Sequence, residues 1–120
     1  GDELHMRPNK LQLEAHPKCN AILEGVKDLS GGRESMHLTI EKKVGELSGI
    51  VVSEWSNGVP CVVVNMPTGK RKGAIVIWNC RPGSSQVSEH GWVASGDGTR
   101  LMFNMLKFAS ASSTEAKFLL

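Results

Sequence analysis

The stretch LSGIVVSEWSNGVPCVVVNM, residues 47–66, decides the fold. It holds two runs rich in valine and isoleucine, Leu47–Trp55 and Val59–Met66, and β-branched side chains of this kind pack well on a pleated sheet. Between the runs lies Ser56-Asn57-Gly58, and Asn-Gly is a strong hairpin signal because both residues tolerate a positive φ. The stretch therefore predicts two antiparallel strands joined by a tight turn.

Apolar runs separated by turns continue on both sides of this hairpin. Met36–Ile40 alternates apolar and polar side chains, Ala74–Trp78 is apolar on both faces, and Gln86–Ser95 is a weaker strand that contains Trp92. Strands then recur about every ten residues, a spacing typical of sandwiches and barrels. We predict one all-β domain, a small antiparallel up-and-down β-barrel, because a barrel also removes exposed strand edges.

The N-terminal segment adds less to this pattern. Residues 1–9 are interpreted as a tag or a disordered stretch, so that the single domain spans residues 10–120. Leu11–Ala15 alternates apolar and polar side chains, which favours a strand. Pro17 argues against one continuous helix through this region.

Composition excludes several classes of protein. The chain has 120 residues, which fits one small domain, and its formal charge of +2 is too small to identify a nucleic-acid-binding protein. No apolar run approaches the length of about 18 residues that a membrane span needs, so we expect no membrane span. The chain has thirteen glycines, as a fold with many turns would, and no tyrosine. Nothing in the sequence assigns a compartment.

The residues that usually carry catalysis or bind metals show no working arrangement. The cysteines lack CxxC spacing and the histidines lack HxH or HExxH spacing. These residues are Cys19, Cys61, Cys80, His5, His16, His37 and His90. We therefore expect a protein that is not an enzyme and that has no metal site.

Several motifs, taken in order, resemble the avidin/streptavidin family. The segment Cys19–Ile40 resembles that family's first strand, ligand loop and second strand, and GELSG at residues 45–49 resembles the start of its third strand. GAIVIW at 73–78 and SEHGW at 88–92 resemble two strands that carry tryptophans of the biotin pocket. Residues 100–116 resemble the seventh strand and its turn, so the resemblance covers roughly residues 19–118.

This resemblance implies a binding or assembly module with a small-molecule ligand in the barrel mouth. The implied ligand-binding residues are Asp28, Ser53, Trp78, Ser88, His90, Trp92 and Met105. The family's tyrosine is replaced by Val51, Met105 stands in place of another pocket tryptophan, and no eighth strand is recognisable. Each lost hydrogen bond costs about 1–3 kcal/mol, so we expect weak or absent affinity for biotin and no other cofactor. Exposed strands favour a homo-oligomer.

Two alternatives stay open. A pleckstrin-homology-like barrel binds a protein or a phosphorylated partner, and the region from Gly91 to Phe108 resembles the end of a Ran-binding domain. That architecture ends in a helix, so the last twenty residues distinguish it from an avidin-like barrel. In the second alternative, the basic turn Lys70-Arg71-Lys72 contacts the phosphates of a nucleic acid rather than being a solvated hairpin tip.

Overall fold

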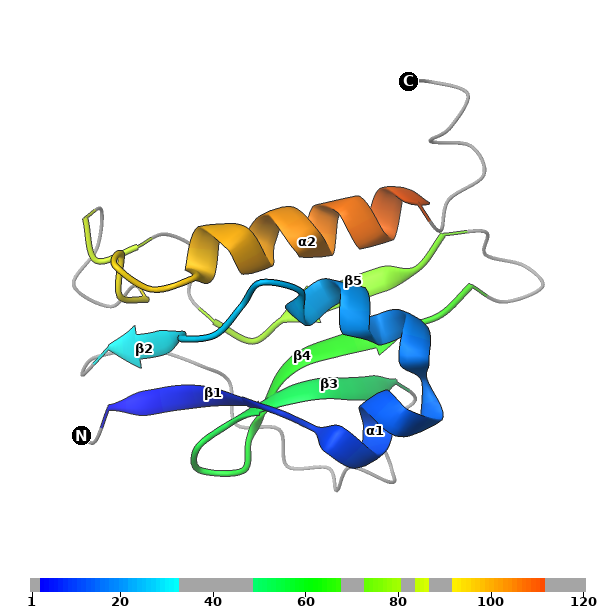
Figure 1. Cartoon of the computed structure of the whole chain (residues 1–120), viewed down its shortest axis with the longest axis horizontal. Helices are drawn as coiled ribbons and strands as arrows, with labels where there is room; N and C mark the ends of the chain where they lie inside the picture. The colour runs from blue at the N-terminus through cyan, green and yellow to red at the C-terminus, as the bar shows by residue number, and fades with distance from the viewer. Residues whose placement is uncertain (1–2, 33–48, 68–72, 81–83, 87–91, 112–120) are drawn as a thin grey trace.

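The computed structural model describes residues 3–32, 49–67, 73–80, 84–86 and 92–111 (Figure 1). Its elements, in chain order, are β1 (Leu4–Pro8), α1 (Lys10–Ala15), the 3-10 helix η1 (Pro17–Leu23), β2 (Ser30–Gly32), β3 (Ile50–Trp55), β4 (Pro60–Asn65), β5 (Ile75–Trp78) and α2 (Gly98–Ala111). In these ranges no helix combines the length and the apolar character that a membrane crossing requires.

The strands form one antiparallel sheet in the order β2-β1-β3-β4-β5. The sheet is curled into a half-barrel, and α2 lies along it (Figure 1). The prediction of a small domain with an antiparallel, barrel-like sheet is confirmed at this level, but the domain is not all-β, because α1, η1 and α2 are helical. The order is not that of a simple up-and-down meander, because β1 lies between β2 and β3. The strand expected over Met36–Ile40 lies outside the described residues.

The β3–β4 hairpin forms as predicted, with a different turn. Trp55 N–H donates to Val59 C=O and Gly58 N–H donates to Trp55 C=O, each at 2.8 Å. Gly58 has a φ of 88°, whereas no described residue other than glycine has a positive φ. The loop is therefore a three-residue connection with glycine at its left-handed position, and Asn57 acts through its side-chain oxygen, which accepts Val59 N–H at 3.1 Å.

The core lies between the sheet and the helical segments. β3 and β4 contribute Val52, Val62 and Val64, which are fully buried, and α2 contributes Leu101 and Met105. Buried Asn104 ties α2 to η1 and the turn after it. Its side-chain amide donates to Ile22 C=O at 2.9 Å and to Glu24 C=O at 2.8 Å, so this polar group costs little to bury.

The expected strand at Leu11–Ala15 is wrong, because Lys10–Ala15 form helix α1. Asn9 caps this helix, and its side-chain oxygen accepts Gln12 N–H at 3.1 Å. Leu13 is buried but Leu11 is 78% exposed, so the alternation does not mark one face of a sheet. The expectation of a tag or disorder over residues 1–9 does not hold for Leu4–Pro8, which form β1.

The segment 100–116, which resembles a seventh strand, forms helix α2 as far as Ala111, in agreement with the alternative interpretation of Leu101–Phe108 as one face of a helix. Leu101 and Met105 are buried one turn apart, and Phe108 packs against the same core. Phe103 and Leu106 are exposed. Helical spacing of the buried residues thus outweighs the apolar content that suggested a strand.

Candidate functional site

Trp78 and Trp92, two of the predicted site residues, lie next to each other in the structure. Trp78 ends β5, and Trp92 lies six residues before α2. Their ring centroids are 6.2 Å apart and their planes are tilted by 35°. Trp92 is 5% exposed, whereas Trp78 is half-buried, so the pair is accessible on the Trp78 side.

Three backbone and packing contacts hold Trp92 in place. Its C=O accepts Ser85 N–H at 2.7 Å, and the following residue, Val93, donates its N–H to Ser30 C=O at 2.9 Å. Gly98 packs directly against the indole, because a Cβ built on Gly98 would lie 2.4 Å from Cε3 of the ring. The backbone around Trp92 is therefore tied to Ser85 and to β2, and the ring packs on the start of α2.

The pair carries buried donors without an acceptor in the described part of the chain. Neither indole Nε1, of Trp78 or of Trp92, has a hydrogen-bond partner there, and the same is true of Ser53 Oγ. Trp55 provides a contrast, because its Nε1 donates to Asn79 C=O at 2.9 Å. Buried donors are normally satisfied, so two indole N–H groups without an oxygen or nitrogen acceptor in the described ranges mark this pair as the candidate site.

Cys61 lies next to two of these donors. Burial raises the pKa of its thiol to about 12, and the Ser53 hydroxyl and Trp78 indole act against that rise by facing the sulfur. These contacts with the sulfur do not have the geometry of a hydrogen bond, because Ser53 Oγ and Trp78 Nε1 have no hydrogen-bond partner among the described residues. A neutral thiol is also a weak acceptor, so it replaces only a small part of a real hydrogen bond. Trp92 Nε1 lacks even this partner in the described region.

Asp28 has a different environment from the one expected. It is exposed, and its N–H and that of Lys27 donate to the Asp97 carboxylate at 2.9 and 2.8 Å. Its C=O accepts Asp97 N–H at 2.7 Å. These bonds hold the pKa of Asp97 below its usual range. Asp28 and Asp97 thus join the loop before β2 to the start of α2.

The remaining predicted residues divide into two groups. Met105 is buried in the core cluster that also contains Trp92. Ser88, His90, Lys70, Arg71 and Lys72 lie outside the described residues. The sequence analysis missed Cys61, Asp97 and Gly98 as neighbours of the site. Asp97-Gly98 before an apolar run is a signal that could have indicated the start of a helix.

The described ranges contain no cluster of three histidine, cysteine or acidic side chains that could bind a metal ion. Comparison of the chain with protein-family models, curated proteins and solved structures finds no match.

Proposed function

We propose that the protein is a non-enzymatic binding module that holds a planar small molecule with a carbonyl-type acceptor against Trp78 and Trp92. The observation that carries this proposal is the pair of buried indole N–H groups without an acceptor in the described chain. An unsatisfied buried donor costs about 1–3 kcal/mol, and a ligand oxygen would remove that cost. Stacking of a flat ring on tryptophan adds about 1–3 kcal/mol.

Biotin is a poor candidate for this ligand. The chain has no tyrosine, and the backbone of Asp28 is bound to Asp97. We keep the avidin-like scaffold in this proposal only because the sheet is curled like part of a barrel. The helix α2 favours the pleckstrin-like alternative at this point, since that architecture also ends in a helix. A nucleic-acid contact through residues 70–72 stays a prediction from the sequence.

Tryptophan fluorescence tests the proposal. The wild-type protein is titrated with biotin, guanosine and uridine, and with inositol trisphosphate and a short RNA for the two alternatives. We expect guanosine or uridine to quench the emission and biotin to have little effect. Trp92→Phe keeps a ring but removes the N–H, so it should weaken binding about tenfold, a loss of about 1.4 kcal/mol. Phe103→Leu, on the exposed side of α2, is the matched control. Equal binding by wild type and Trp92→Phe would contradict the proposal.

The outer strand β5 favours a second role in self-assembly. None of the described strands pairs with the side of β5 that faces away from β4. Asn79 N–H donates to Cys61 C=O at 2.7 Å, so alternate residues face β4 and the N–H groups of Val76 and Trp78 point away from it. Ile75 and Ile77 are 44% and 48% exposed on this strand. A second copy of the chain could pair here and cover both isoleucines.

Light scattering coupled to size-exclusion chromatography tests the assembly. We expect a dimer for the wild type and a monomer for Ile77→Lys, because charge on an edge strand opposes pairing. Leu106→Lys adds the same charge on the exposed side of α2 and should leave the dimer intact. A wild-type monomer at high concentration would rule out this role.

A further inference from the structure

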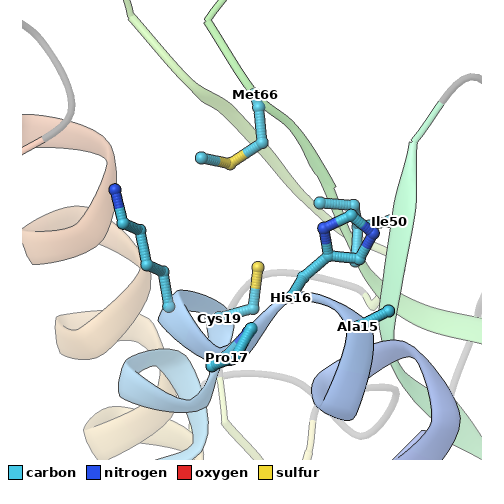
Figure 2. A pocket seen from close by; sticks show the side chains of 7 residues that line it. Ala15, His16, Pro17, Cys19, Ile50 and Met66 are labelled. Carbon is cyan, nitrogen blue, oxygen red and sulfur yellow. The ribbon is translucent and has the colours of Figure 1, made fainter.

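A cavity of about 220 Å³ lies where the α1–η1 corner meets the ends of β3 and β4 (Figure 2). Its walls are formed by seven residues, Ala15, His16, Pro17, Lys18, Cys19, Ile50 and Met66. Neither tryptophan of the pair lines it, so it is separate from the site described above. Its lining includes an imidazole, a thiol and a thioether, and no carboxylate.

The local fold places His16 and Cys19 on one side of the corner. His16 is the junction residue, because its N–H donates to Gln12 C=O at 2.9 Å and its C=O accepts Cys19 N–H at 3.0 Å. His16 immediately precedes the 3-10 helix and Cys19 lies in its first turn, and both residues line the cavity. Figure 2 shows the sulfur of Cys19 directed toward Met66, with the His16 ring beside it.

The Cys19 thiol points into this space from a buried position. Cys19 is 1% exposed, and its sulfur lines the cavity. None of the described residues is a hydrogen-bond partner of the thiol. A soft cation that enters the cavity would gain a thiolate ligand by displacing the proton.

We propose that His16, Cys19 and Met66 bind one copper(I) ion. Thiolate and thioether sulfur select soft monovalent copper, and imidazole suits copper as well. The charges agree with this choice. Copper(I) and a thiolate are neutral together, whereas a divalent ion on one thiolate keeps a positive charge beside Lys18, and none of the described lining residues carries a carboxylate that would offset it. Binding is a simple exchange in which the Cys19 sulfur–hydrogen bond is lost, the sulfur–copper bond forms and one proton enters solution.

Anaerobic competition with bicinchoninate tests this site. Reduced protein is added to the coloured copper(I)–bicinchoninate complex, and the fall in absorbance gives stoichiometry and affinity. We expect one copper(I) bound and one proton released for each chain. His16→Ala and Met66→Leu should each weaken binding by more than the roughly 10–100-fold typical of an outer-shell partner, and Cys19→Ser should abolish it. His16 is exposed and Leu is close to Met in volume, so these two variants should fold.

Matched controls separate this site from adventitious binding. His5→Ala removes another exposed histidine, and Cys80→Ser removes another thiol, one that does not line the cavity. Both should bind copper(I) like the wild type. The proposal would be overturned if Cys19→Ser kept full binding, if Cys80→Ser or His5→Ala lost it, or if zinc competed equally for the site. Far-UV circular dichroism confirms that each variant is folded before its result is used.

Discussion

The indole of Trp92 lies on Gly98, so close that a Cβ at position 98 would stand 2.4 Å from the ring. Gly98 begins α2, where alanine would ordinarily stabilise a helix by up to about 1 kcal/mol. At position 98 we expect alanine to destabilise the protein instead. Gly98→Ala should lower the free energy of unfolding by about 1–3 kcal/mol, because the ring must shift within a packed core.

Urea unfolding measures this change, and Thr99→Ala is its control. Thr99 is the next residue of α2 and is exposed, so its substitution should stay within about 0.5 kcal/mol of the wild type. A stabilised Gly98→Ala protein would show that Trp92 does not occupy this position.

Asn104 gives a second stability test. Asn104→Ala removes two side-chain hydrogen bonds and leaves the carbonyls of Ile22 and Glu24 without that donor. We expect a loss of about 1–3 kcal/mol in thermal or urea unfolding. Lys107→Ala, an exposed change on the same helix, should have a negligible effect. Equal stability of the two variants would contradict the described packing of α2 on η1.

Asp97 predicts how stability depends on acid. Hydrogen bonds from the backbone N–H groups of Asp28 and Lys27 lower its pKa in the folded state. The stabilisation that these hydrogen bonds give to the folded protein is complete above the ordinary aspartate pKa of about 3.9. It is lost as the pH falls through the lower pKa that Asp97 has in the folded state. Asp97→Asn should therefore show a shallower decline of melting temperature below about pH 4 than the wild type. The prediction would be contradicted if the melting temperatures of the two proteins declined in parallel below about pH 4.

Thiol reactivity distinguishes the cysteines. Burial raises the pKa of Cys61 to about 12, so only about one thiol in ten thousand is ionised at pH 8. Cys19 is also buried, whereas Cys80 is half-buried. We expect one fast reaction with Ellman's reagent in the native protein, and its loss in Cys80→Ser. All three thiols should react after unfolding in urea. Fast labelling of Cys61 in the native state would contradict its burial.

Local signals predicted the central part of the fold. Residues 50–65 form a hairpin because their β-branched side chains and the Gly58 turn act over a short range. The sequence did not predict α1, because a six-residue helix with one buried leucine has no clear period. It did not predict β1 either, since the pairing of Leu4–Pro8 depends on β2 and β3, which lie far along the chain.

In the candidate site, too, local sequence motifs could be recognised but contacts between distant segments could not. Trp78 and Trp92 were identified from the resemblance of residues 73–78 and 88–92 to strands that carry pocket tryptophans in the avidin/streptavidin family. Their surroundings were not predicted, because Cys61 approaches Trp78 from the neighbouring strand and Gly98 approaches Trp92 from the start of α2. The hydrogen bonds of Asp28 were not predicted either, because its partner Asp97 lies just before the same helix.

Strand β1 lies inside the sheet, between β2 and β3, although it comes first in the chain. Met6 lies opposite Trp55, so the strand that leaves the ribosome early has to wait until β3 has been synthesised. The contacts between β3 and β4 are local, so this hairpin can form first, whereas docking of β1 on β3 closes a long loop and is slow. During synthesis the early strand therefore exposes its edges for longer than any part of the hairpin, and chaperone capture or misassembly would begin there.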